Sequence, residues 1–176
     1  ENSSFYGCSI KSISIPRKVK FIGENAFFLC YKLKTINLPI DSKLVTLDSN
    51  AISFSLIESL FIPSKVEELK NGWCCSTKEL NEILISPQNP IFSYLDDEKK
   101  IVVAKSGKKS YDLIFACRNI EKVYIRPDIN RICVDSFMEC NHLTKIEFSE
   151  NSQLEYIEDN AFRNCSLLKS ISIPFR

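Results

Sequence analysis

The chain has 176 residues, enough for one domain with a hydrophobic core. Hydrophobic residues make up 44% of it and charged residues 26%, a balance typical of globular proteins and not of disordered chains. The formal net charge of +1 excludes a bulk electrostatic attraction to nucleic acid or to an anionic membrane. No apolar run approaches the roughly 18–20 residues of a membrane span, so we expect no membrane insertion and no nucleic-acid partner.

Short segments of alternating apolar and polar residues recur along the chain, and a proline closes nearly all of them. They are ISIP (13–16), INLP (36–39), LFIP (60–63), ILISP (83–87), VYIRP (123–127), IEFS (146–149) and ISIP (171–174). Alternation predicts a strand with one buried face, and proline, which lacks an N–H group, belongs at the strand end. The closing positions are separated by 23, 24, 24, 40, 22 and 25 residues.

Further apolar residues recur between one predicted strand and the next. Each unit has an apolar pair followed by a small and a bulky residue. Examples are Val19, Ile22 and Ala26-Phe27, then Val66, Leu69 and Gly72-Trp73, and also Leu154, Ile157 and Ala161-Phe162. A single unit of about 23 residues cannot bury all these side chains, whereas stacked units bury them in continuous columns. The sequence therefore predicts a parallel-stranded solenoid of about seven turns, with repeats that end near residues 16, 39, 63, 87, 127, 149 and 174.

The interval from Gln88 to Pro127 is longer than the others, at 40 residues. It predicts two or three short strands with a polar turn at Asp96-Asp97-Glu98. The basic stretch at 98–109 predicts a solvated hairpin, with a polyanion site as the alternative. We interpret 88–127 as an enlarged, divergent repeat within a single domain of residues 1–176.

Eight cysteines raise the question of disulfides. Four of them share one place in their repeats: Cys30, Cys117, Cys140 and Cys165. Parallel side chains on turns about 4.8 Å apart are poorly placed for S–S bonds, so we expect a column of buried free thiols. Cys74, Cys75 and Cys133 lie outside this column. We expect these three to be more exposed, with a disulfide or a reactive thiol as the alternative there.

The sequence contains no recognisable catalytic or metal-binding constellation. There is no C-x-x-C pair, and the single histidine, His142, has no partner at a metal-ligand spacing. None of the 4 glycines forms a phosphate-cradling loop. We therefore expect no catalytic residues, no metal and no cofactor, and a chain that is not an enzyme.

Residues 22–39 and 157–174 follow the pattern I-x-x-x-A-F-x-x-C-x-x-L-x-x-I-x-I-P almost completely. This pattern resembles the BspA-like leucine-rich repeats. The resemblance implies a right-handed solenoid with a concave parallel β-sheet, little regular helix and one hairpin-bearing enlarged repeat. It further implies a non-enzymatic, secreted or cell-surface adhesin or antigen that contacts host matrix proteins or other cells. An intracellular, cytoplasmic scaffold or signalling module is the alternative.

In such a solenoid the outward residues of the strands form the binding surface. At the middle of this surface the sequence places apolar side chains next to charged ones. They are Phe61, Leu84 and Tyr124, beside Glu82, Lys122 and Lys145. Exposed apolar neighbours bordered by charge are typical of a protein contact surface, so we expect a protein ligand here. The alternative is that the enlarged repeat covers these residues.

The two ends of the chain carry a separate prediction. The chain opens in the middle of a repeat, so we expect it to be a fragment of a longer protein. Ile171 and Ile173 are expected to form an uncovered edge strand, which is a template for pairing. Either further repeats cover that edge or two copies associate end to end.

Overall fold

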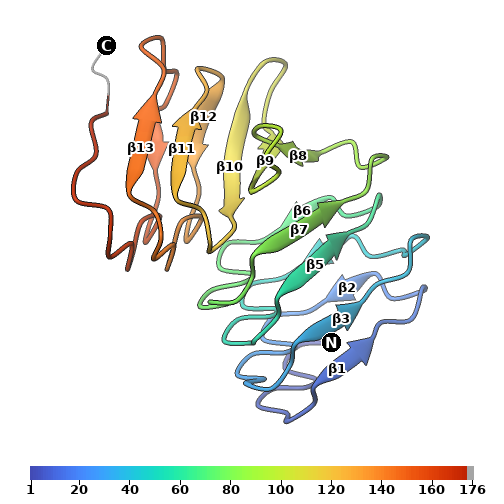
Figure 1. The fold of residues 1–176 in the computed structure, drawn as a ribbon. Helices are drawn as coiled ribbons and strands as arrows, with labels where there is room; N and C mark the ends of the chain where they lie inside the picture. The colour runs from blue at the N-terminus through green and yellow to red at the C-terminus, as the bar shows by residue number, and fades with distance from the viewer. Residues whose placement is uncertain (174–176) are drawn as a thin grey trace. The chain divides into compact units, whose positions relative to one another are not determined.

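The computed structural model describes residues 1–173, which contain fourteen short strands and no helix (Figure 1). The chain divides into two compact units, Glu1–Phe92 and Ser93–Arg176. The sequence predicts a single domain of residues 1–176, and this stays a prediction.

The first unit contains a row of long strands at the predicted places. Its members are β1 (Ser12–Ser14), β3 (Thr35–Asn37), β5 (Ser59–Ile62) and β7 (Glu82–Ile85) (Figure 1). β1 pairs with β3 and β5 pairs with β7, in both cases parallel. The register places Leu60 opposite Ile83, so buried apolar residues of successive turns face the same side, as the alternation predicts.

A second row of strands, which the sequence analysis did not predict, runs through the upstream apolar pairs. It consists of β2 (Phe21–Ile22), β4 (Thr46–Leu47) and β6 (Glu68–Leu69), all parallel. Ile22 lies opposite Leu47, and Leu47 lies opposite Leu69. The predicted column of apolar side chains therefore exists, and its backbone is also hydrogen-bonded from turn to turn.

Between the two rows, each turn has two residues in the left-handed backbone conformation, spaced four apart. The pairs are Ser3 and Gly7, Asn25 and Leu29, Asn50 and Phe54, Gly72 and Ser76, Asp135 and Glu139, and Asn160 and Asn164, with φ between 53° and 71°. This conformation costs most residues about 1–2 kcal/mol, and asparagine and glycine tolerate it best. Their recurrence gives every regular turn the same bend.

Backbone hydrogen bonds within this bend fix which residues of successive turns correspond. The Phe27 N–H donates to the carbonyl of Ala51 (2.8 Å), and the Ile52 N–H donates to the carbonyl of Trp73 (3.0 Å). Trp73 therefore occupies the place of the small residue, and Cys74 occupies the place of the bulky one. The predicted small and bulky pair, Gly72 and Trp73, is wrong by one position.

The second unit contains two sheets. β11 (Lys122–Ile125) pairs in parallel with β13 (Lys145–Phe148) and continues the pattern of long strands (Figure 1). The other sheet has the order β14-β12-β10-β9-β8. Its strands are β8 (Phe92–Tyr94), β9 (Ile101–Lys105), β10 (Tyr111–Ala116), β12 (Ile129–Ile132) and β14 (Tyr156–Ile157).

The enlarged repeat supplies β8, β9 and β10, which confirms the predicted short strands. β9 and β10 form an antiparallel hairpin, and β10 also pairs in parallel with β12 of the next turn. The N–H of Leu95 donates to the carbonyl of Ile101 (2.9 Å) and closes the polar turn that the sequence places at Asp96-Asp97-Glu98. The insertion therefore ends in a strand that rejoins the regular ladder.

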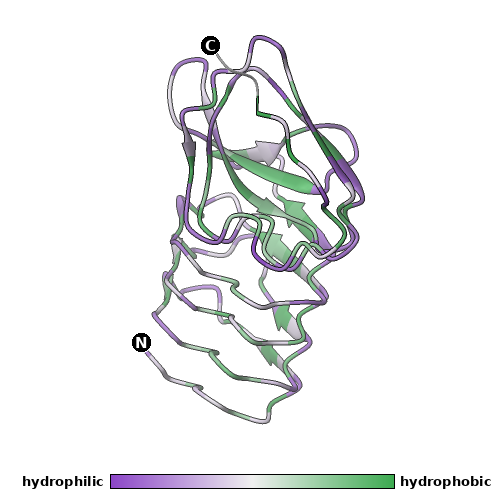
Figure 2. Ribbon diagram, turned by 90° about the vertical axis from the view of Figure 1, so that its left-hand side faces the viewer, coloured by the Kyte–Doolittle hydropathy of each residue, from purple (hydrophilic) through white to green (hydrophobic). Residues whose placement is uncertain are grey.

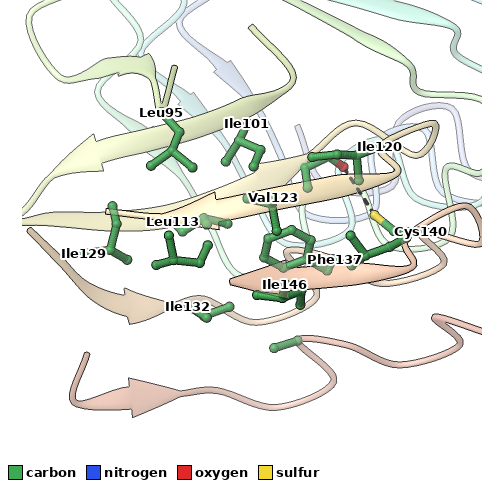
Figure 3. Packing of buried hydrophobic residues seen from close by; sticks show 14 of the residues in the cluster. Leu95, Ile101, Leu113, Ile120, Val123, Ile129, Ile132, Phe137, Cys140 and Ile146 are labelled. Carbon is green, nitrogen blue, oxygen red and sulfur yellow. Dashed lines mark hydrogen bonds between the residues drawn. The ribbon is translucent and has the colours of Figure 1, made fainter. Parts of the chain in front are cut away.

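The core of the second unit lies between its two sheets. Figure 3 shows Leu113, Val123 and Ile146 converging from different strands, next to Phe137. The Phe137 ring stacks on Phe162 of the next turn, with 5.0 Å between ring centroids. In Figure 2 the strands are largely green, hydrophobic ribbon, as expected for elements that bury one face.

The last predicted strand is absent. Ile171 and Ile173 are 37% and 40% exposed, and no strand is assigned to residues 171–173. Among the described residues no backbone hydrogen bond joins this segment to β13. Alternation alone does not form a strand when the apolar side chains remain in solvent. Pro174, which was predicted to close this strand, lies outside the described residues.

Candidate protein-interaction surface

On the first unit, the outward residues of the long strands form the strand face. Phe61 of β5 lies directly opposite Leu84 of β7, as predicted. Phe61 is half-buried and Leu84 is 48% exposed, because Leu60, Ile62 and Ile83 take the buried positions on either side. Two apolar side chains therefore stand together on this face.

The charged neighbour on the first unit is also at its predicted place. Glu82 begins β7 and lies opposite Ser59 of β5, on the same side of the sheet as Leu84. It is exposed to solvent. The carboxylate therefore borders the apolar pair without being buried by it.

On the second unit, the corresponding strand face centres on Tyr124. This side chain is 53% exposed and lies opposite Glu147, while Lys122 lies opposite Lys145. The ammonium group of Lys145 is 2.5 Å from a carboxylate oxygen of Glu147. Tyr124 and Leu84 belong to different sheets, and they lie in different units. The adjacency of Leu84 and Tyr124 therefore stays a prediction.

The enlarged repeat borders Tyr124 without burying it. A hollow of about 220 Å³ lies between the polar turn of the insertion and the strands β11 and β13. Its lining consists of Asp96, Glu98, Lys122, Val123, Tyr124, Lys145 and Glu147. A second hollow, of about 490 Å³, also borders Tyr124 and is lined by Tyr124, Glu147, Phe148, Ser149, Glu150 and Asn151. The two hollows share Tyr124 and Glu147.

Arg126 positions the polar turn beside this surface. Its Nε and Nη2 atoms bond to the two carboxylate oxygens of Asp128 at 3.0 and 3.1 Å, and its Nη1 atom donates to the carbonyl of Leu95 at 2.5 Å. The guanidinium also lies 5.5 Å from the ring centroid of Tyr111. The bidentate ion pair orients the guanidinium, and the bond to Leu95 holds the residue before Asp96.

Three residues at or beside this surface were not predicted from the sequence: Arg126, Asp128 and Glu150. The only available signal was an arginine and an aspartate on either side of Pro127, the proline that closes the strand. Asp96 and Glu98 were interpreted as a solvated turn. They are exposed, as expected, but they also line the smaller hollow.

The cysteine column is confirmed. All eight cysteines are free, and Cys30, Cys117 and Cys140 are buried, while Cys165 is half-buried. The Cys30 thiol donates to the Phe5 carbonyl, and the Cys165 thiol donates to the Phe137 carbonyl, each at 3.0 Å. Cys140 makes longer bonds of this kind, one of which is dashed in Figure 3.

Cysteine is not the only donor at this position. In the two turns that lack it, Ser55 and Thr77 are buried at the same place. Their hydroxyl groups donate to the carbonyls of Ile52 and Cys74, each at 2.7 Å. The column therefore requires a small side chain that satisfies a main-chain carbonyl, and thiol and hydroxyl groups both meet this need.

The expectation of greater exposure for the remaining cysteines is wrong for two of them. Cys74 and Cys133 are buried and Cys75 is half-buried. Cys74 is buried because it occupies the bulky place of its turn. Burial raises the pKa of the Cys133 thiol to about 12 and that of the Cys140 thiol to about 12 as well.

The described residues contain no group of three or more His, Cys, Asp and Glu side chains arranged to hold a metal ion. His142 is exposed, as expected for a residue in a turn. Within residues 1–173 no helix has the length and apolar character needed to cross a bilayer.

Comparison with known proteins agrees with this architecture. The family described as "BspA type Leucine rich repeat region" matches residues 1–95 and 79–176, with six copies. A leucine-rich cell-surface protein of Faecalibacterium prausnitzii is similar in structure, with a TM-score of 0.80 and 21% identity over 98% of this chain. The pneumococcal vaccine antigen PcpA is similar with a TM-score of 0.83 and 26% identity over 95% of this chain. A leucine-rich repeat protein of Eubacterium ventriosum has a TM-score of 0.74 and 15% identity over 95% of this chain.

The matched structures are longer than this chain. The chain spans 50% of the F. prausnitzii protein, 40% of PcpA and 55% of the E. ventriosum protein. No curated protein matches the sequence. The matched repeat family is in general a non-enzymatic, protein-interaction fold. Since the family matches nearly every residue and the repeated turns carry its pattern, the chain belongs to the BspA-type leucine-rich repeat proteins.

Proposed function

We propose that this chain is a non-enzymatic, protein-binding repeat domain of a microbial surface adhesin or antigen. The observation that carries the proposal is the pair of apolar side chains Phe61 and Leu84, in register on the strand face. Exposed apolar residues bordered by charge, here Glu82, are typical of protein contact surfaces. Tyr124 gives the strand face of the second unit an aromatic anchor of the kind enriched in such contacts.

The backbone supports this role because it is regular and hydrogen-bonded from turn to turn. A surface that is already ordered loses little conformational entropy when it binds a partner. The ligand that we propose is a protein, namely a host matrix protein or a protein on a neighbouring cell.

The proposed location is the cell surface or the extracellular space. It is supported by two similar structures, one described as a cell-surface protein and one as a vaccine antigen. Both of these proteins are longer than this chain. A ligand for the whole surface protein is therefore proposed here and is not taken from them.

The test is a binding assay of the chain against immobilised fibronectin, laminin, collagen and intact host cells. The triple variant Phe61→Ser, Leu84→Ser, Tyr124→Ser is expected to lose at least tenfold in affinity, because contact energy concentrates in a few anchors. The matched control is Tyr31→Ser with Ile40→Ser. These two residues are exposed, at 61% and 82%, but lie outside the strands.

Circular dichroism and thermal unfolding establish that each variant is folded. If the folded triple variant binds as tightly as the original chain, the strand faces are not the contact surface. If no protein and no cell type binds, the adhesin proposal itself is wrong.

The second candidate is an intracellular scaffold, which one observation favours. All eight cysteines are free, and free thiols persist in a reducing compartment. Surface biotinylation of intact cells distinguishes the candidates. Labelling of the protein on unbroken cells supports the adhesin, and labelling only after lysis supports the scaffold.

A further inference from the structure

The second unit has four tyrosines, and three of them hold a cation over the ring. Arg131 lies 4.8 Å from the ring centroid of Tyr156, Arg126 lies 5.5 Å from that of Tyr111, and Lys99 lies 5.9 Å from that of Tyr94. Such contacts are attractive because the negative face of the ring meets a positive charge.

Tyr124 is the exception. Among the described residues no lysine, arginine or aromatic side chain is found over its ring, although the ring is 53% exposed. Its face is therefore accessible to a group from another molecule.

The larger hollow beside Tyr124 is acidic. The hollow has a volume of about 490 Å³. Its lining includes the carboxylates of Glu147 and Glu150 and no lysine or arginine. Glu147 is already paired with Lys145 at 2.5 Å. Glu150 is exposed, and no ion pair is found for it within residues 1–173. One carboxylate next to the open ring is thus free to pair with a cation.

The smaller hollow does not select a charge. It contains the carboxylates of Asp96, Glu98 and Glu147 together with Lys122 and Lys145. Lys122 lies directly opposite Lys145, so a cation that approached from this side would meet two ammonium groups. A positive group is therefore favoured in the larger hollow, which Glu150 lines and which has no lysine or arginine.

A metal ion does not fit these observations. The acidic side chains here do not form a group of three ligands in the described part of the chain. An aromatic ring next to a single unpaired carboxylate instead suits a guanidinium or ammonium group, which can stack on the ring and form a charged hydrogen bond.

We propose that the strand face of the second unit binds a polypeptide segment of the partner that carries a basic side chain. The guanidinium or ammonium group of this side chain lies over Tyr124 and pairs with Glu150. This inference rests on the proposed function, because it specifies the chemistry of a protein ligand that binds the strand face. It assigns to the partner the cation that the other three tyrosines receive from the chain itself.

The test is an NMR titration of the ¹⁵N-labelled chain with three short peptides. Acetyl-Gly-Ser-Arg-Ser-Gly-amide carries the cation. In the two control peptides citrulline, a neutral isostere, or glutamate, which has the opposite charge, replaces the arginine. A single exposed cation–π contact and one exposed ion pair are each worth about 1 kcal/mol or less, so a dissociation constant of roughly 30 mM or weaker is expected. We expect shifts for Tyr124 and residues 147–151 with the arginine peptide, and none with the other two.

Variants separate the ring from the carboxylate. Tyr124→Leu is expected to weaken binding of the arginine peptide about threefold to tenfold, whereas Tyr124→Phe, which keeps the aromatic face, binds as the original chain does. Glu150→Gln is expected to weaken it about threefold, and 0.5 M NaCl has a similar effect because salt screens the ion pair. The matched controls are Tyr31→Leu and Glu79→Gln, which alter an exposed ring and an exposed carboxylate in the first unit.

Several results would overturn the inference. These are the absence of shifts at about 100 mM arginine peptide, roughly three times the expected dissociation constant, equal binding of the citrulline peptide, or equal weakening by Glu79→Gln. The protein ligand found in the binding assay separates the two proposals. Suppose that Tyr124→Ser and Tyr124→Phe both weaken binding of this protein ligand, while Glu150→Gln leaves it unchanged. The proposed function then stands and this inference fails. If neither the protein nor the peptide responds to changes at Tyr124, both fail for this face.

Discussion

The first unit repeats one turn with little change, whereas the second unit begins with an insertion. In the first unit all strand pairs are parallel and join consecutive turns. In the second unit the antiparallel hairpin of β9 and β10 replaces a regular turn, and β10 then pairs in parallel with β12. The difference shows that a solenoid tolerates an irregular turn when its last strand offers the next turn a correct register.

Charged side chains join neighbouring turns in both units, and in the second unit one of them also binds the insertion. In the first unit the ion pairs Arg17–Asp41, Lys34–Glu58 and Lys70–Asp48 join neighbouring turns on the surface. In the second unit Arg126 bonds to a carbonyl 31 residues away and also contacts a ring. Arg131 and Glu158 also pair between neighbouring turns of the second unit, at 2.6 Å, so what distinguishes this unit is the bond of Arg126 to the insertion.

The largest expected difference concerns thiol reactivity. Burial raises the pKa values of Cys133 and Cys140 to about 12, so their thiolate fraction at pH 8 is about a thousandfold lower than that of an ordinary thiol. We expect them to react with a disulfide reagent about a thousandfold more slowly than free cysteine, and all eight thiols to react after denaturation. Mass spectrometry of the modified peptides measures each rate. Fewer than eight thiols in the denatured chain would reveal disulfides.

Truncation of one stacked phenylalanine in each unit tests whether the units unfold independently. Phe27 stacks on Phe5 at 5.1 Å in the first unit, and Phe137 stacks on Phe162 at 5.0 Å in the second. Each change to alanine is expected to lower the free energy of unfolding by about 3–5 kcal/mol, because both side chains are buried. Hydrogen exchange is expected to accelerate mainly in the unit that carries the change. Equal acceleration throughout by either variant would instead support the single domain predicted from the sequence.

Asn89, near the end of the first unit, is expected to have the next largest effect. Its amide nitrogen donates to the carbonyls of Pro63 and Val66, and its oxygen accepts from the N–H groups of Ile91 and Phe92, all at 2.9 Å. Asn89→Ala is expected to lower the free energy of unfolding by about 2–3 kcal/mol, because it leaves several main-chain groups without a partner. Urea unfolding measures this change.

The control for Asn89→Ala is the exposed neighbour, in the variant Gln88→Ala, which is expected to change the free energy of unfolding by less than about 0.5 kcal/mol. Similar losses for the two variants would mean that the side chain of Asn89 does not hold this segment.

The left-handed position of the regular turn provides a smaller test. Asn25 has a φ of 55°, which a β-branched residue adopts poorly. Asn25→Val is expected to lower the free energy of unfolding by about 1–2 kcal/mol, whereas Asn25→Gly is expected to be nearly neutral. Thermal unfolding of both variants measures the difference. If valine is tolerated as well as glycine, the bend does not require this conformation.

The smallest expected effect is a pH dependence in the first unit. The hydrogen bond from Lys70 holds the pKa of Asp48 below its ordinary value. Folding is therefore favoured by this group at pH values above about 4, the unfolded pKa of aspartate, and the contribution is lost as the pH falls through the lower, folded pKa. Asp48→Asn is expected to reduce the loss of stability between pH 5 and pH 2. The measurement is the urea midpoint of each chain between pH 5 and pH 2. If the midpoint of Asp48→Asn falls with pH as steeply as that of the original chain, Asp48 does not contribute to the pH dependence.

The sequence predicts the repeating part of the fold because period-two alternation and a closing proline act locally. Six of the seven predicted long strands are present, and the exception, at 171–174, is the one whose isoleucines stay exposed. The second row of strands was not predicted because its regular members, such as β2, are only two residues long.

The candidate surface could be predicted only in part. Alternation identifies Phe61, Leu84 and Tyr124 as outward residues, since each lies between two apolar residues that are less exposed than a residue facing solvent would be. It does not reveal that Arg126 reaches Leu95, or that Tyr124 differs from the other tyrosines of its unit. Both facts depend on contacts between segments that are far apart in the chain.

The paired left-handed residues set a fixed length within the regular turn. Six turns keep a spacing of four between the two residues, while the connections outside the bend vary and one of them admits a hairpin. Recombination between two copies of the gene segment would therefore preserve the fold when the crossover falls between bends and disturb it when it falls within one. A protein of this kind can lengthen, shorten or exchange turns in evolution or in the laboratory, as long as whole bends are passed on intact.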